Sequence, residues 1–263
     1  MENIEYRTFD GSHNNKTNPQ WGKAGTPLRR ITTPSYGDGI STLAQRGESD
    51  INPRSISNRL CKQDHPNFNQ NGLSDFTWAW GQFLDHEMDL SDINDSDSAD
   101  IDVPSGDEQL PGGGRIPFNR SVFDPTSGES VGTPREQTNV LSSYIDASNV
   151  YGSNILRASA LRAFDGTGRL KTSKGPEGEF LPYNIAGLPN AELPGTVSSS
   201  LFIAGDIRAN EHAVLTSMHT LFMREHNRLC LEIIAHDPGL LGDDETIYQQ
   251  ARKIVGGLMQ AVT

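Results

Sequence analysis

The stretch Leu73–Leu90, LSDFTWAWGQFLDHEMDL, constrains the fold of this chain more than any other segment. It begins with Ser74, a residue type that caps the N-terminus of helices, and with Asp75, whose charge suits the positive end of a helix. Apolar residues then recur at three- and four-residue steps, at Phe76, Trp80, Phe83 and Leu84. This period predicts a helix with one apolar face packed into a core.

The same helix carries three polar side chains that suit a functional site. Gln82 and His86 are four residues apart, so they project from one side of a helix, about 6 Å from each other. Asp85 lies beside them in the sequence. A histidine, an amide and a carboxylate on an aromatic-rich helix fit a buried polar pocket better than a surface. The alternative is that His86 is a core histidine held by one hydrogen bond.

Length and composition limit the classes of protein that this chain can belong to. A chain of 263 residues forms one large domain or two small ones. Only 34% of the residues are hydrophobic, and the chain holds 26 glycines and 15 prolines, so long polar loops should separate the buried helices. A net charge of -12 argues against nucleic acid and anionic membranes as partners, because both would repel the protein.

Cysteine content and hydropathy give further limits. Cys61 and Cys230 are the two cysteines, so a disulfide framework does not hold the fold together, although one bridge stays open. No run of about twenty apolar residues is present, which predicts no membrane span. The N-terminus lacks the pattern of a signal peptide. A cytosolic protein, a chain that begins downstream of its signal and export through a C-terminal signal all fit this observation.

The first half of the chain is rich in turn-forming residues. Residues 1–50 are predicted to form an extended arm over a helical body at 51–263, with Trp21, Leu28 and Ile31 as apolar anchors. A short helix is expected at 52–62, after Pro53. The acidic stretch 91–114 has carboxylates at alternate positions, but it does not match the twelve-residue calcium loop, so a solvated loop is favoured. Residues 115–135 should form an ordered loop.

Oxygen-bearing residues alternate in the segment 139–154, NVLSSYIDASNVYGSN. In an extended chain, alternate side chains point the same way. Two hydroxyls, a carboxylate and the intervening carbonyls are the ligand types that a hard cation takes, although serine-rich turns give the same pattern. The residues concerned are Ser142, Tyr144, Asp146 and Ser148.

The second half of the chain carries the strongest helical periodicity. Helices are predicted at 156–164, at 211–236 with Asn210 as N-cap, and at 243–262 after a stop at Pro238 and Gly239. Arg208 stands just before the longest helix, where a loop can direct it into a pocket. Three histidines on that helix are seven residues apart, which is too far to share one metal ion, so we expect separate structural roles for them. They are His212, His219 and His226.

Three separated motifs, in this order, resemble the animal-type haem peroxidase superfamily: WGQFLDHEMDL, LSSYIDASNVYGS and GDIRANEHAVLTSMHTLFMREHNRL. The segments YRTFDGSHNN, WGKAGTPLRR and ARKIVGGLMQAVT also look like family segments, so the resemblance covers nearly the whole chain. It implies a mainly α, haem-peroxidase-like helical domain with long loops. Residues 1–263 would be the N-terminal portion of one such domain.

The resemblance also implies roles for individual residues. His86 matches the distal histidine, which moves a proton between the two oxygens of hydrogen peroxide. Arg208 matches the distal arginine, whose charge stabilises the negative charge that develops as the O–O bond breaks. Gln82 matches a glutamine that hydrogen-bonds halide and water. Asp85 and Glu211 match the two carboxylates that form ester links to haem b, and both being present favours the peroxidase branch over the fatty-acid oxygenase branch.

Two departures from the family pattern affect the expected chemistry. His212 stands where chloride-oxidising members carry a methionine bonded to the haem, so bromide, iodide, thiocyanate or phenols are expected as donors. The calcium site of the family uses an aspartate after the distal histidine, and here that residue is Glu87. The calcium ligands implied by the resemblance are therefore Glu87, Ser142, Tyr144 through its carbonyl, Asp146 and Ser148.

A third departure concerns the C-terminal part of the family pattern. None of the seven histidines matches the proximal histidine that binds the haem iron, so the domain is expected to be C-terminally incomplete. The expected function is haem-dependent oxidation of small donors by hydrogen peroxide, in an exported protein. The alternatives are a non-catalytic fragment or calcium-stabilised binding module, and a fatty-acid oxygenase of the same superfamily.

Overall fold

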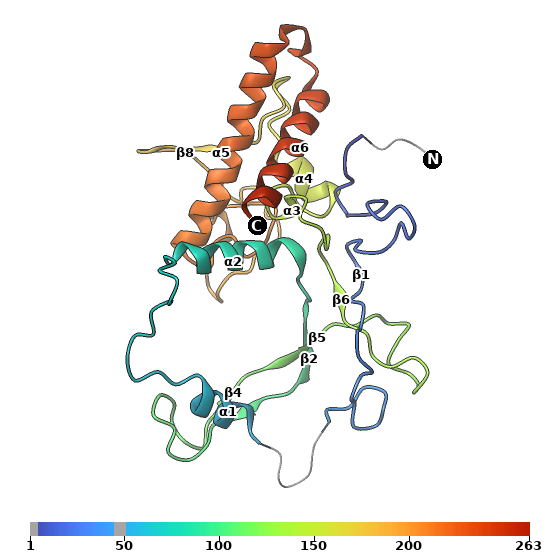
Figure 1. Cartoon of the computed structure of the whole chain (residues 1–263), viewed down its shortest axis with the longest axis vertical. Helices are drawn as coiled ribbons and strands as arrows, with labels where there is room; N and C mark the ends of the chain where they lie inside the picture. Colours follow the sequence, from blue (N-terminus) through green and yellow to red (C-terminus); the bar gives the residue numbers. More distant parts are fainter. Residues whose placement is uncertain (1–4, 45–50) are drawn as a thin grey trace. The chain divides into compact units, whose positions relative to one another are not determined.

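A computed structural model of the chain describes residues 5–44 and 51–263, which form two compact units (Figure 1). The first unit takes the chain up to Thr26 together with Ser74–Leu90 and Val140–Thr263. The second unit takes Pro27–Leu73 and Ser91–Asn139. The prediction of a mainly α fold with long loops is confirmed. The prediction of one arm at 1–50 on a single body stays a prediction.

The first unit is built from helices. They are α2 (Phe76–Met88), α3 (Ser148–Tyr151), α4 (Ile155–Leu161), α5 (Ala213–His236) and α6 (Asp244–Val262). Short 3-10 helices lie at η1 (Ser198–Ser200) and η2 (Pro238–Leu240), and β7 (Ser173–Gly175) pairs antiparallel with β8 (Gly178–Phe180). Helices α5 and α6 lie side by side, and α2 packs near the beginning of α5 (Figure 1).

One hydrophobic core joins the helices of the first unit. Phe83 of α2 stacks on Phe222 of α5, with their ring centroids 5.3 Å apart. The core also takes in Tyr151, Leu215, Met223, Ile247, Tyr248, Val255 and Met259, all of which are fully or almost fully buried. The predicted apolar face of α2 is confirmed at Phe83 and wrong at Phe76, whose residue surface is 63% exposed. Phe76 lies at the first position of the helix, before the contact with α5 begins.

Two of the predicted helix starts are wrong. Ser74 does not cap α2, which begins at Phe76 after Asp75. Asn210 does not cap α5, because its amide is used by a neighbouring segment: Oδ1 accepts from the Phe202 N–H at 3.0 Å and Nδ2 donates to the Phe202 carbonyl at 2.8 Å. The Nδ1 of His212 accepts from the Leu215 N–H instead. Sequence preference for a cap is weak compared with such tertiary hydrogen bonds.

The second unit contains α1 (Pro53–Leu60) and short antiparallel strands. Helix α1 follows Asn52, whose side chain caps it, which confirms the predicted short helix. The loop predicted at 91–114 is wrong at two places, because β2 (Ile93–Ser98) pairs with β5 (Asn119–Ser121) and β3 (Ile101–Asp102) with β4 (Arg115–Ile116). Most of the segment is exposed, as predicted. Strands β4 and β5 interrupt the ordered loop predicted at 115–135. The remaining pair is β1 (Thr26–Pro27) with β6 (Thr138–Asn139).

Polar contacts hold the second unit's strands, since few of their side chains are buried. The buried guanidinium of Arg135 pairs with Asp97 of β2 and donates to the Ser121 carbonyl of β5. The predicted anchors Trp21, Leu28 and Ile31 are exposed, so the prediction that they are anchors is wrong. Cys61 and Cys230 are both free. Among the described residues, no helix has the length and apolarity needed to cross a membrane.

Candidate active site

Helix α2 presents Gln82 and His86 on one side, as the four-residue spacing predicts. His86 is 5% exposed, whereas Asp85 is exposed. In the described part of the chain, no group makes a hydrogen bond to His86 Nδ1, which lies 3.7 Å from Asp206 Oδ1. Burial lowers the pKa of His86, and the positive charge of Arg208 lowers it further. The imidazole is therefore neutral near neutral pH.

Arg208 is held in a fixed direction by Asp206 and α2. Its backbone N–H and its Nε donate to Asp206 Oδ1 at 2.8 and 2.9 Å, and its Nη2 donates to Asp206 Oδ2 at 2.9 Å. Nη2 also lies 3.3 Å from the carbonyl oxygen of His86 and 3.0 Å from that of Asp89. The structure thus brings His86 and Arg208 to one buried carboxylate, that of Asp206.

Asp206 is the residue of this site that the sequence reasoning missed. Its side chain has no exposed surface, and its backbone N–H donates to the Asn149 carbonyl at 2.9 Å, which fixes the loop before α5. A signal was available in GDIR, because an aspartate two residues before an arginine can accept from both its backbone and its guanidinium.

Gln82 connects the beginning of α5 to α2. His212 Nδ1 accepts from the Leu215 N–H, so the ring proton is on Nε2, which donates to Gln82 Oε1 at 2.7 Å. The amide Nε2 of Gln82 then donates to Glu211 Oε2 at 2.8 Å. Trp78 stacks on the His212 ring with centroids 5.1 Å apart. Gln82 and Glu211 are thus brought together, and Glu211, like Asp85, is exposed.

His212, His219 and His226 have separate environments, as predicted. His226 Nδ1 pairs with the Tyr151 hydroxyl at 2.8 Å, and its Nε2 lies 3.0 Å from the Gly168 carbonyl. His219 packs edge-on against Phe83. Within the described residues, no cluster of three histidine, cysteine, aspartate or glutamate side chains that could hold a metal ion is present.

The predicted calcium ligand Glu87 is fully buried, and backbone N–H groups surround its carboxylate. Oε1 accepts from the N–H groups of Asp146 at 2.7 Å, of Ala147, and of Ser148 at 3.1 Å. Oε2 accepts from the Asn149 N–H at 2.9 Å. Burial and the neighbouring Asp146 carboxylate raise the pKa of Glu87, and the backbone N–H donors oppose that rise.

The other predicted calcium ligands hydrogen-bond to one another and to the backbone. Ser142 Oγ donates to Asp146 Oδ2 at 2.6 Å, and Ser148 Oγ donates to the Glu87 carbonyl at 2.9 Å. The Tyr144 hydroxyl donates to the Trp21 carbonyl at 2.7 Å. The segment is not extended throughout as predicted, because Ala147 has a left-handed backbone and α3 begins at Ser148.

Comparison with known proteins places this geometry in a family. The family model described as animal haem peroxidase matches residues 6–263. A peroxidasin homolog of Caenorhabditis elegans is 33% identical over 98% of this chain and 23% of the relative, and a lactoperoxidase of Mesocricetus auratus is 33% identical over 98% of this chain and 41% of the relative. The chain therefore spans less than half the length of these relatives.

Solved structures agree with the sequence comparison. Peroxidase A from Dictyostelium discoideum superimposes with a TM-score of 0.86 at 30% identity, covering 98% of this chain and 52% of that chain. A fatty acid alpha-dioxygenase of Arabidopsis thaliana gives a TM-score of 0.73 at 22% identity, covering 98% of this chain and 36% of that chain, which shows a shared fold alone. Because the family model matches nearly its whole length, this chain belongs to the animal haem peroxidase family.

Proposed function

We propose that this chain supplies the distal side of a peroxidase site, in which hydrogen peroxide oxidises a small donor. One observation carries the proposal: the His86 imidazole and the Arg208 guanidinium lie against the same buried carboxylate, that of Asp206. A neutral base and a fixed cation, held together, are the two groups that cleavage of a peroxide bond requires.

The residues fit haem b, the cofactor that the family implies. When bound, haem supplies an iron that binds peroxide and stores the oxidising equivalents. Asp85 on α2 and Glu211 before α5 are both exposed, so haem can reach their carboxylates, and we propose that they hold it through ester links. The α2 and α5 helices pack directly on each other, which keeps both anchors on one rigid frame.

His86 moves the proton. The Asp206 carboxylate near Nδ1 favours the tautomer with a proton on Nδ1, which leaves the lone pair on Nε2. Nε2 takes a proton from one peroxide oxygen and gives it to the other, so that the O–O bond can break and the protonated oxygen can leave as water. The remaining oxygen atom and the two oxidising equivalents would stay with the haem. The lowered pKa of His86 serves the first step, because a protonated imidazole has no lone pair to accept with.

Arg208 and Gln82 complete the site. The guanidinium stays charged at every working pH, and Asp206 fixes its direction, so it stabilises the negative charge on the departing oxygen without reorganising. Gln82 is held by His212 on one side and Glu211 on the other, and we propose that it orients the water or halide in the pocket.

Because His212 stands where chloride-oxidising members carry a methionine, we propose bromide, iodide, thiocyanate or phenols as the donors. We also propose that the protein is exported.

Calcium does not fit the residues predicted to bind it, because backbone N–H groups hold both oxygens of the Glu87 carboxylate, three at Oε1 and one at Oε2. The fatty-acid oxygenase alternative is not favoured, because its support is a shared fold alone, and Asp85 and Glu211 are both present. The experiment must therefore distinguish a peroxidase from the remaining alternative, a non-catalytic binding module.

The test is to titrate the full-length gene product with haem and to follow the Soret absorbance and then peroxide consumption with bromide or guaiacol. We expect haem to bind and His86→Ala to lower the rate by about 10²- to 10⁴-fold, the range for losing a general acid–base. The matched control is His236→Ala, an exposed histidine at the end of α5, which should keep the wild-type rate. Equal rates in wild type and His86→Ala would remove the assignment, and failure to bind haem would favour the non-catalytic module.

A further inference from the structure

The buried carboxylate of Glu87 lies inside a turn of consecutive backbone N–H groups. Residues 146–149 all donate to it, three of them to Oε1 and one to Oε2. The turn points these groups inward because Ala147 has φ 66° and ψ 30°, the left-handed conformation. Such a concave arrangement of N–H groups attracts an anion, because each donor carries a partial positive charge.

This arrangement has the wrong polarity for a cation. Each carboxylate oxygen offers about two lone-pair positions, so the three N–H donors at Oε1 occupy both of its positions and the single donor at Oε2 leaves one. Calcium takes six to eight oxygen ligands, and each must point a lone pair toward the ion. The four N–H groups instead point hydrogens at the Glu87 carboxylate, which leaves it little capacity to bind a cation as well. The Glu87 carbonyl is also used, since it accepts from Ser148 Oγ at 2.9 Å.

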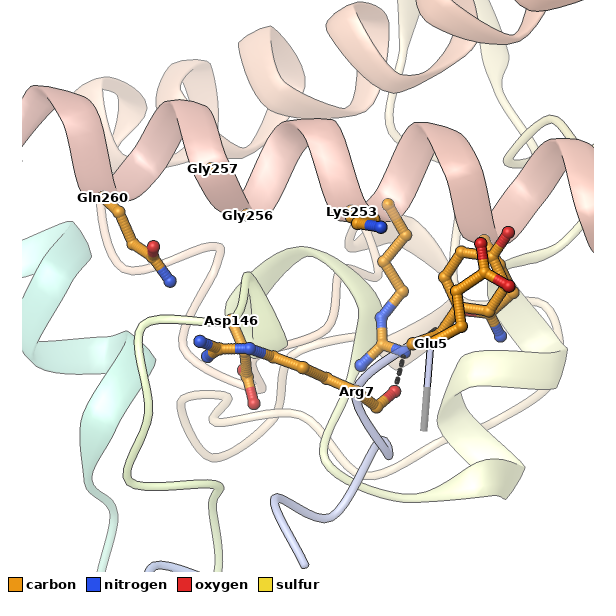
Figure 2. Close-up of a pocket in the computed structure, with 10 residues that line it drawn as sticks. Glu5, Arg7, Asp146, Lys253, Gly256, Gly257 and Gln260 are labelled. Carbon is orange, nitrogen blue, oxygen red and sulfur yellow. Dashed lines mark hydrogen bonds between the residues drawn. The ribbon is translucent and has the colours of Figure 1, made fainter. Parts of the chain in front are cut away.

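The second buried carboxylate of the segment, Asp146, has positive side chains nearby. Asp146, Arg7 and Arg252 line one cavity of about 240 Å³, and Figure 2 shows the Arg7 side chain extending along Asp146. Arg252 is fixed there, because its Nη1 donates to the Arg7 carbonyl at 2.7 Å and its Nη2 to the Thr8 carbonyl at 3.0 Å. Two guanidinium groups, neither of them within ion-pairing distance of Asp146, therefore place positive charge on its cavity side.

We propose that Glu87 is a built-in anion that organises residues 146–149, and that this chain forms the segment without a calcium ion. Glutamate in place of the family's aspartate is one methylene longer, so its carboxylate reaches the four N–H groups. The guanidinium groups of Arg7 and Arg252 supply positive charge to Asp146. The proposal is independent of peroxidase activity, and its test uses the haem-free chain.

The first measurement is thermal unfolding of the chain in excess EGTA and in millimolar calcium, with calorimetric titration of calcium at room temperature. We expect the same Tm in both buffers and no stoichiometric heat of binding. A calcium ion bound with a Kd a hundred times below its concentration would raise Tm by at least about 5 °C in a chain of this size. Such a rise, or one calcium bound per chain, would overturn the proposal.

The second measurement tests the carboxylate itself. Glu87→Gln keeps the shape of the side chain, but it removes the charge and turns an NH₂ group toward N–H donors. We expect its Tm to fall by several degrees in EGTA and in calcium alike, because buried donors then lose their acceptor. The control is Glu192→Gln, at an exposed position, with an unchanged Tm. A Glu87→Gln variant as stable as wild type would sink the inference.

Discussion

The carboxylate of Asp206 accepts three hydrogen bonds from Arg208, one from its backbone N–H and two from its guanidinium, at 2.8 to 2.9 Å. Asp206, two positions before Arg208 in the sequence, thereby fixes both the loop and the direction of the Arg208 guanidinium. We propose that Asp206 is a positioning residue that acts through Arg208 and, across 3.7 Å, through His86.

Asp206→Asn should weaken the proposed reaction without removing haem. The asparagine NH₂ faces a guanidinium that can only donate, so Arg208 loses its fixed direction. A misplacement of about 1 Å costs roughly 10²-fold in rate, and we expect a loss of that order in peroxide consumption by the haem-loaded chain. Asp95→Asn, at an exposed position of β2, is the control. An unchanged rate in Asp206→Asn would show that Arg208 needs no such support.

The proposed ester links predict how tightly haem stays on the chain after turnover. Asp85 and Glu211 would each contribute one covalent bond, so either Asp85→Asn or Glu211→Gln alone still leaves the haem attached. The double variant should release all of its haem into acidic ketone, whereas wild type and both single variants retain it after exposure to peroxide. Absorbance of the extract and the protein mass give the result. Complete release of haem from the wild type would contradict the proposal.

The sequence predicts those features that depend on local chemistry. The spacing of Gln82 and His86 places them on one side of α2, and Asp243 caps α6 through the Thr246 N–H at 3.2 Å. The end of α5 at His236, before Pro238, also follows from local rules. Each of these features is set by neighbours within about one turn of chain.

Features set by distant neighbours could not be predicted. Asn210 is a good helix cap by type, but its amide bonds to Phe202. Glu87 was assigned to a cation by its place in a motif, and its actual partners are backbone groups about sixty residues away. Asp206 lies near His86 only because α2 packs beside the loop before α5, although its bonds to Arg208 are local. Backbone N–H donors do not depend on the side chain, so no pattern of residue types predicts which of them will bind Glu87.

Buried His219 should make the stability of the chain depend on pH. Burial lowers its pKa to about 4, from 6.5 when exposed. Above pH 6.5 both the folded and the unfolded states hold it neutral, so its contribution to stability is complete. As the pH falls below 6.5 the unfolded state binds the proton first, and stability is lost until the pH reaches about 4.

His219→Leu should remove that loss. In the described part of the chain neither ring nitrogen of His219 has a hydrogen-bond partner, so leucine gives up no bond. Between pH 7 and pH 5 the wild type should lose about 2 kcal/mol more unfolding free energy than the variant. Urea unfolding of both proteins at the two pH values measures the difference. An equal loss in both would mean that His219 is protonated in the folded chain.

Gly205 should tolerate no side chain, because the loop that carries Asp206 passes directly over α3. A Cβ at Gly205 would lie within 2.6 Å of the Tyr151 nitrogen and closer still to the Ser148 carbonyl oxygen, and both are backbone atoms that cannot rotate away. Gly205→Ala should therefore lower the unfolding free energy by roughly 3 kcal/mol or more. Gly257→Ala is the matched control: it lies exposed within α6 with open space at its Cβ, so alanine should raise the unfolding free energy by about 0.5–1 kcal/mol. If urea unfolding gave both variants the same sign, the close approach at Gly205 would be wrong.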